Sequence, residues 1–232
     1  MGTDEIRGAR VERDPDARRA RMAERRRLEE ALEKIYTHAD PGVRVATRDE
    51  LCDLVRARLG DEAITYLEFG VKGGRSMSRI AARFGHGHAR FVGFDSFEGL
   101  PEAWWNQEAG KFSTEGKVPG TRDPRVRFVK GWFQNTLPGF LASFEPSRDT
   151  PLLVHFDADL YGSTLFVLAQ LWERTHEYYF MFDEFMHDEA IALYDFSRAF
   201  PVELEFYAQT TTSVFKQVFG RMRRVEFKPV SG

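Results

Sequence analysis

The sequence has a single cysteine, Cys52, and no run of apolar residues long enough to span a membrane. One cysteine excludes an internal disulfide and a metal cluster held by several thiolates. The polar residues 1–16 lack the apolar core of a signal peptide, and Ile6 stands where a myristoylation signal has serine or threonine. We therefore expect a cytoplasmic protein with no membrane partner.

The chain also lacks an excess of positive charge. It has 33 basic and 36 acidic residues, which give a formal net charge of -3. The whole molecule therefore offers nucleic acid no general electrostatic attraction, and the basic run at 18–27 is typical of the solvated face of a helix. Hydrophobic residues make up 42% of the chain, enough to build the core of one large domain. A small molecule is the expected binding partner.

The first predicted helix begins at Pro15, because proline is well tolerated at the first helical position. Leu28, Leu32 and Ile35 recur at helical spacing with charged residues between them. Such a stripe needs a surface to cover. The sequence leaves open whether that surface is the main domain or the second subunit of a homodimer.

A second helix begins at the capping box Thr47–Glu50 and ends at Gly60. Beyond it the pattern changes to short apolar strands that alternate with helical segments. We therefore divide the chain into an N-terminal helical segment, residues 1–60, and a main domain, residues 61–232.

Short, nearly continuous apolar runs in the main domain predict strands that are covered on both faces, as in a parallel sheet. Two runs near the end of the chain predict an antiparallel pair. The fold class expected is α/β and Rossmann-like, with a mostly parallel seven-stranded sheet and an antiparallel C-terminal hairpin. The predicted strands are 64–70, 89–95, 126–131, 152–157, 178–183, 202–209 and 213–219.

Polar residues gather where these strands end, which is where open α/β sheets bind ligands. The first strand ends in the glycine turn 70–74, whose backbone can approach a ligand closely. The second ends in Asp95, well placed to accept hydrogen bonds from ribose hydroxyls. Lys72 breaks the fingerprint of dinucleotide-binding proteins, and the chain has no phosphate loop, so NAD and ATP are disfavoured.

Several motifs resemble those of a known family. The stretch "E-x-G-x-x-G-G" followed by Asp95 resembles class I S-adenosylmethionine-dependent methyltransferases. The stretches "GFDSFEGLPE", "FVKGWFQNTLP", "HFDADLYGST" and "MFDEF" follow in the order of the macrocin O-methyltransferase family, which modifies sugar hydroxyls on natural products. The similarity runs from about residue 64 to residue 200. It implies the class I methyltransferase fold, with S-adenosyl-L-methionine and Mg²⁺ as cofactors.

The resemblance also implies roles for individual residues. Asp157 would be a metal ligand and the catalytic base, while Asp159 would be either a further functional carboxylate or the cap of a turn. The implied metal ligands are Asp157, Asp183 and Glu184. The implied cofactor-binding residues are Glu68, Gly70, Gly74, Arg75, Ser76, Asp95, Ser96, Phe97 and Trp132.

Physical reasoning supports the metal independently, because carboxylates at adjacent strand ends repel one another unless a hard cation joins them. The alternative for each aspartate is a helix or turn cap. Two features of this chain depart from the family. The family's acidic pair usually consists of two aspartates, whereas the second residue here is Glu184. The family also usually has glycines just before the strand that ends in this pair, and this chain has none there.

The stretch 97–120 is long, aromatic and punctuated by glycine, so it is either a lid over the substrate or a surface loop held by its tryptophans. The function expected is magnesium-dependent O-methylation of a hydroxyl on a small natural-product or sugar intermediate. A carboxylate or phenol acceptor, or a non-catalytic scaffold that keeps the cofactor, are the alternatives.

Overall fold

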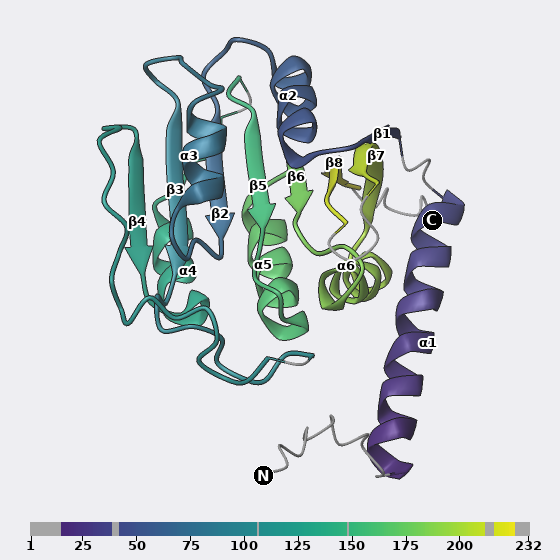
Figure 1. Ribbon diagram of the computed structural model, residues 1–232. Helices are drawn as coiled ribbons and strands as arrows, with labels where there is room; N and C mark the ends of the chain where they lie inside the picture. The colour runs from purple at the N-terminus through teal and green to yellow at the C-terminus, as the bar shows by residue number, and fades with distance from the viewer. Residues whose placement is uncertain (1–14, 39–41, 106, 148, 212–215, 226–232) are drawn as a thin grey trace, which may run out of the picture.

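The structure, a computed structural model, describes residues 15–38, 42–105, 107–147, 149–211 and 216–225. Helices and strands alternate along most of the chain, as the sequence predicts (Figure 1). The helices are α1 (Pro15–His38), α2 (Arg48–Leu59), α3 (Arg75–Ala81), α4 (Phe133–Ala142), α5 (Tyr161–Arg174) and α6 (Asp188–Ala199). The strands are β1 (Val43–Val45), β2 (Thr65–Phe69), β3 (Arg90–Asp95), β4 (Val126–Lys130), β5 (Leu152–Phe156), β6 (Glu177–Phe182), β7 (Val202–Thr210) and β8 (Val218–Arg224).

The strands form one sheet in the order β1-β7-β8-β6-β5-β2-β3-β4. All neighbouring pairs are parallel except those that involve β8, which runs antiparallel to β6 and β7. The Rossmann-like fold with an antiparallel C-terminal hairpin is therefore confirmed. Among the described residues the sheet has eight strands, one more than the seven predicted, because the three-residue strand β1 pairs with the outer edge of β7.

The last strand was predicted at 213–219, which is wrong for residues 216 and 217 because β8 begins at Val218. Residues 213–215 lie outside the described residues. The apolar run in the sequence ends just before the arginines at 221, 223 and 224, so periodicity alone predicts that the strand ends there. In the structure the strand continues through them, because Arg221 pairs with Glu205 on β7 while the alternate residue Met222 is buried.

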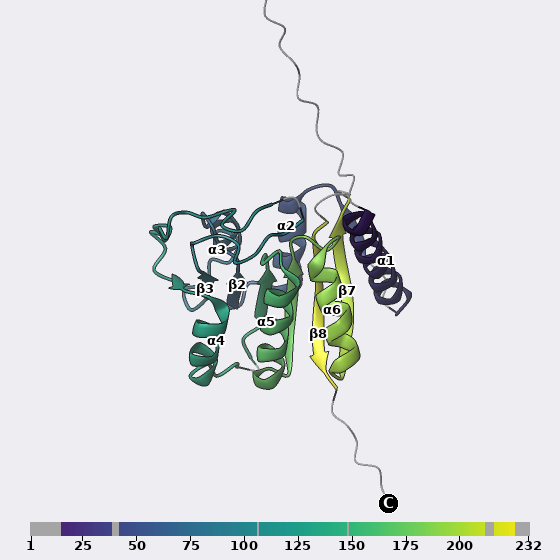
Figure 2. The same ribbon diagram turned by 90° about the horizontal axis from the view of Figure 1, so that it is seen from below.

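Two apolar layers cover the sheet. Figure 2 shows α2 and α3 on one side of the sheet and α4, α5 and α6 on the other. The first side is filled by a cluster that includes Leu51, Tyr66 and Phe91, and the second by a cluster that includes Phe69, Phe156 and Phe182. The strands are therefore buried on both faces, which explains their nearly continuous apolar sequences.

The N-terminal helix α1 packs against α6 of the same chain. Ile35 is buried in the larger core cluster, with Leu28 and Leu32 packed against it, so the predicted apolar stripe covers the domain. Arg27 of α1 forms an ion pair with Asp195 of α6. No helix in the described part of the chain combines the length and apolar character needed to cross a membrane.

The described residues of the predicted N-terminal segment, 1–60, contribute to the same sheet and core as the main domain. In α2, Leu51, Val55 and Leu59 are buried. The predicted cap is present as well, since the Thr47 side chain accepts a hydrogen bond from the backbone N–H of Glu50. This cap fixes the first turn of α2, from which Arg48 extends toward the end of β6.

Candidate active site

The glycine turn after β2 brings the carboxyl ends of β2 and β5 into close contact. Gly70 has φ +98°, and a Cβ atom there would lie 1.8 Å from the carbonyl oxygen of Asp157. No residue with a side chain fits this position without moving the backbone. The turn is therefore built around the close approach of two strand ends.

Asp95, at the end of β3, holds this turn in place. One carboxylate oxygen accepts hydrogen bonds from the backbone N–H groups of Val71 at 2.8 Å and Lys72 at 2.7 Å. The other accepts from the backbone N–H of Phe97 at 2.7 Å. A carboxylate offers about four acceptor sites, so Asp95 keeps acceptor capacity on the side that faces the cavity.

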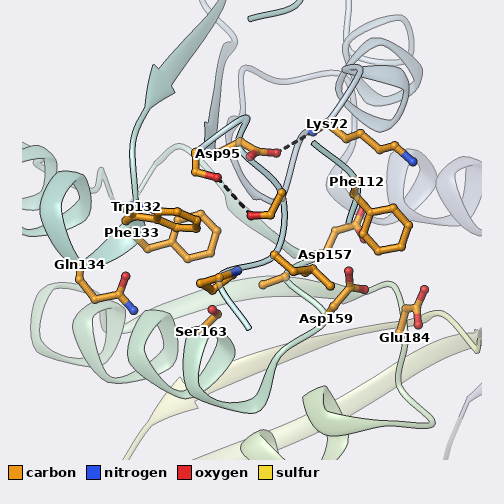
Figure 3. Close-up of a pocket in the computed structure, with 16 residues that line it drawn as sticks. Lys72, Asp95, Phe112, Trp132, Phe133, Gln134, Asp157, Asp159, Ser163 and Glu184 are labelled. Carbon is orange, nitrogen blue, oxygen red and sulfur yellow. Dashed lines mark hydrogen bonds between the residues drawn. The ribbon is translucent and has the colours of Figure 1, made fainter. Parts of the chain in front are cut away.

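A cavity of about 550 Å³ opens at the carboxyl ends of β2, β3, β5 and β6. Figure 3 shows Trp132 and Phe133 at one end of it and the carboxylates of Asp157, Asp159 and Glu184 at the other. Its lining comprises Gly70, Lys72, Asp95, Ser96, Gly99, Leu100, Pro101, Phe112, Trp132, Phe133, Gln134, Asp157, Ala158, Asp159, Ser163 and Glu184. One end is therefore aromatic and suited to a flat ring, and the other is acidic.

The acidic end places several carboxyl groups close together in a largely buried setting. Burial, then Asp183 and Asp159, raises the pKa of Asp157 well above its usual range. Burial and the charge of Asp183 raise the pKa of Asp159 to about 7, and burial and the charge of Asp159 raise that of Glu184 to about 8. Among the described residues none donates a hydrogen bond to the Asp157 carboxylate, and the buried Oε2 of Glu184 has no partner. This arrangement favours the binding of a cation.

Asp183 lies beside these carboxylates but does not line the cavity, and it is 5% exposed. One of its oxygens pairs with Arg48. The other accepts from Gln217 Nε2 at 2.8 Å and contacts His155 Nε2 at 3.3 Å. Burial raises the pKa of Asp183, but the hydrogen bond and charge of His155, followed by the charge of Arg48, outweigh it and lower the pKa. Asp183 is therefore held as an anion.

Among the described residues, three side chains at the acidic end have ligand atoms close enough together to hold one metal ion. Ligand atoms of His155, Asp157 and Asp183 all lie within 4.8 Å of one another. This group shares Asp157 and Asp183 with the ligand set implied by the sequence resemblance. It has His155 in place of Glu184, which instead lines the adjoining cavity.

A buried row of hydrogen bonds lies on the α2 and α3 side of the sheet. Ser76 Oγ donates to Glu68 at 2.6 Å, and the Tyr66 hydroxyl lies 2.8 Å from the other Glu68 oxygen. Tyr66 is also 2.7 Å from Nδ1 of His155, which continues to Asp183. Burial raises the pKa of Glu68. The row thus connects the helix after the glycine turn with the acidic end of the cavity.

The structure brings some of the predicted site residues together around the cavity. Those that line it are Gly70, Asp95, Ser96, Trp132, Asp157 and Glu184. Those that do not are Glu68, Gly74, Arg75, Ser76, Phe97 and Asp183. Glu68 and Ser76 lie in the buried row, Gly74 caps α3, and Arg75 is exposed. Phe97 is buried and contributes its backbone N–H to Asp95.

Other residues around the site were not predicted. Lys72, Gln134 and Ser163 line the cavity, and the sequence signal for them was their position just after strand ends or at helix starts. Arg48, which reaches Asp183 from a separate part of the chain, had no such signal.

The connection between β3 and β4 forms one wall of the cavity. Phe112 lines it, and Lys72 Nζ lies 4.6 Å from the centre of the Phe112 ring. Trp104 is 5% exposed and its ring packs edge-on against His187, while Trp105 is 66% exposed. The buried Trp104 holds this loop against the domain, as expected for a surface loop anchored by its tryptophans. The same loop also contributes Phe112 to the cavity wall, where a lid over the substrate would lie.

Comparison with known families gives one match that covers half of the chain. The family model described as Methyltransferase domain matches residues 67–185, from β2 through the end of the acidic pair. A search of functionally curated proteins found no match.

Solved structures share the fold at low sequence identity. An O-methyltransferase from Bacillus cereus in complex with SAH aligns with a TM-score of 0.50 and 15% identity, over 86% of this chain and 91% of that chain. CalS11, a TDP-rhamnose 3'-O-methyltransferase of calicheamicin biosynthesis, aligns with a TM-score of 0.49 and 21% identity, over 93% of this chain and 97% of that one.

Proposed function

Because this chain belongs to the family of methyltransferase domains, and is thus an enzyme, we propose that it transfers a methyl group from S-adenosylmethionine to a hydroxyl of a small molecule. The observation that carries the proposal is the cavity with an aromatic end beside Asp95 and an acidic end at Asp157. A methyl donor bound between them would have its adenosine near Trp132 and its sulfonium near the carboxylates. The SAH bound to the Bacillus cereus protein is consistent with this choice of donor.

The residues of the acidic end fit a divalent cation such as magnesium. Asp157 has no donor partner among the described residues, and the buried Oε2 of Glu184 is unpaired. Hard cations prefer oxygen ligands of this kind. We propose that Asp157, Asp183 and Glu184 hold the ion, with Asp159 also facing the cavity. When bound, such an ion lowers the pKa of a coordinated substrate hydroxyl.

The chain's own residues would supply orientation and proton transfer. Asp95 keeps the glycine turn in position and would accept hydrogen bonds from the donor's ribose. Asp157 lines the cavity and would accept the acceptor's proton. The methyl group of a sulfonium is already activated, so catalysis needs chiefly alignment and removal of this proton.

The motifs that resemble the macrocin O-methyltransferase family favour an acceptor that is a sugar or natural-product intermediate. The rival proposals are a phenol or a carboxylate as the methyl acceptor. Transfer of a labelled methyl group from S-adenosylmethionine would be measured with TDP-rhamnose as a sugar hydroxyl and catechol as a phenol, each with magnesium and with EDTA.

We expect transfer to the sugar hydroxyl, abolished by EDTA and restored by magnesium. Transfer to catechol alone would support the phenol rival, and transfer that persists in EDTA would contradict the metal requirement. Calorimetry of S-adenosylmethionine binding provides an independent control, because a protein that does not bind the donor cannot have the proposed function at all.

A further inference from the structure

A positively charged side chain of the chain itself contacts the acidic end. Arg48, the first residue of α2, pairs with one oxygen of Asp183. Its charge also acts on Glu184, where it opposes the rise in pKa caused by burial and by Asp159. The guanidinium of Arg48 thus interacts electrostatically with two of the three proposed metal ligands.

The contact is fixed from two sides. The Thr47 cap holds the first turn of α2, and Gln217 and His155 hold the other oxygen of Asp183. Asp183 is 7% exposed at its side chain, whereas the side chain of Arg48 is 36% exposed. Arg48 therefore has an open route to solvent, and Asp183 does not.

We propose that Arg48 is an internal counter-ion that competes with the divalent cation for Asp183 and so sets the metal affinity of the site. This inference rests on the metal site of the proposed function. A divalent ion and a guanidinium bound to the same carboxylate repel each other. The ion must therefore either share the Asp183 carboxylate with Arg48 or displace Arg48 from it. The contact thereby weakens metal binding while it keeps the metal-free cluster from carrying its full negative charge.

The test measures metal binding directly, with no acceptor present. Mn²⁺ binding would be followed by the loss of the free-ion signal in electron paramagnetic resonance, and Mg²⁺ binding by calorimetry, at pH 8.5. We expect Arg48→Met to bind either ion about tenfold more tightly than the unmodified protein, a factor that corresponds to about 1.4 kcal/mol.

Two matched variants separate charge from structure. Arg48→Lys keeps the positive charge and should bind the ions nearly as the unmodified protein does. Arg58 belongs to the same helix, but its guanidinium stacks on Tyr207, away from the acidic end. Arg58→Met should therefore leave metal affinity unchanged. Circular dichroism and thermal melting show which variants fold.

The outcomes distinguish this inference from the metal site on which it rests. If the unmodified protein and Arg48→Met both fail to bind the ions, the metal site is wrong. If the unmodified protein binds them and folded Arg48→Met binds them equally or more weakly, the competition is wrong. A tenfold gain that also occurs in Arg48→Lys would contradict a role for the charge. Should Arg48→Met not fold, Arg48→Gln takes its place, with the same expected gain.

Discussion

Asp95 and Asp183 both terminate parallel strands at the same edge of the sheet, yet their carboxylates are satisfied in opposite ways. Asp95 accepts from backbone N–H groups of Val71, Lys72 and Phe97, which belong to the turns directly after β2 and β3. Asp183 depends on three side chains from separate elements. The comparison teaches that one end of the cavity is fixed by the path of the backbone and the other by long-range side-chain contacts.

The largest effect is expected from a substitution that changes only the acidic end. Asp157→Asn keeps the shape of the side chain but removes the proton acceptor, so turnover should fall by about 10²-fold or more. Donor affinity should change little, because Asp157 lies away from the aromatic end. Steady-state kinetics with the acceptor that gives turnover, together with calorimetry of S-adenosylmethionine, measure both quantities. Full turnover in this variant would leave Asp157 as a structural residue.

The next largest effect is expected from a substitution at Asp95, whose end of the cavity is fixed by backbone hydrogen bonds. Asp95→Ala removes the acceptor of three backbone hydrogen bonds and of the proposed ribose contact, so S-adenosylmethionine affinity should fall by about 1.5 to 3 kcal/mol. Mn²⁺ affinity should stay near that of the unmodified protein, since Asp95 is not among the acidic residues at the other end. Calorimetry on a folded variant with unchanged donor affinity would refute the assignment of Asp95.

The smallest effect concerns pH. Glu184 and Asp159 have pKa values raised to about 8 and about 7, above those of the unfolded chain, so their protonated forms favour the folded state. This contribution is complete below the unfolded pKa, near pH 4, and is lost as pH rises toward 8. The melting temperature of metal-free protein should therefore fall between pH 6 and pH 8.5, and magnesium should restore it.

Glu184→Gln supplies the control for the pH effect. This variant removes the ionising group that has the higher pKa of the two, so its melting temperature should depend less on pH over the same interval. An equal dependence in the variant and the unmodified protein would assign the effect to other groups.

The same contrast explains what the sequence could predict. The glycine turn and Asp95 follow their strands directly, so apolar periodicity and strand-end position were enough to place them at the cavity. Asp157 and Glu184 were found at the cavity for the same reason. The Rossmann-like sheet followed from apolar runs whose length matches strands buried on both faces.

The rest depends on contacts between distant parts of the chain. Arg48 is 135 positions from Asp183 in the sequence, and its capping-box context predicts only the start of a helix. Strand β1 is three residues long and has no apolar run, so periodicity carries no signal for it. The true extent of β8 was hidden because its outward residues are arginines that pair with glutamates on β6 and β7.

The buried row from Ser76 through Glu68, Tyr66 and His155 joins the start of α3, just after the glycine turn, to Asp183 beside the acidic end of the cavity. Groups in one buried hydrogen-bond network are energetically coupled, and the effects of changing them are not additive. A double-mutant cycle between Ser76 and Asp183 should therefore yield a nonzero interaction energy, although the two residues do not touch. In evolutionary terms, the start of α3 and the acidic end are not free to change independently, because a substitution accepted at one alters which substitutions the other tolerates.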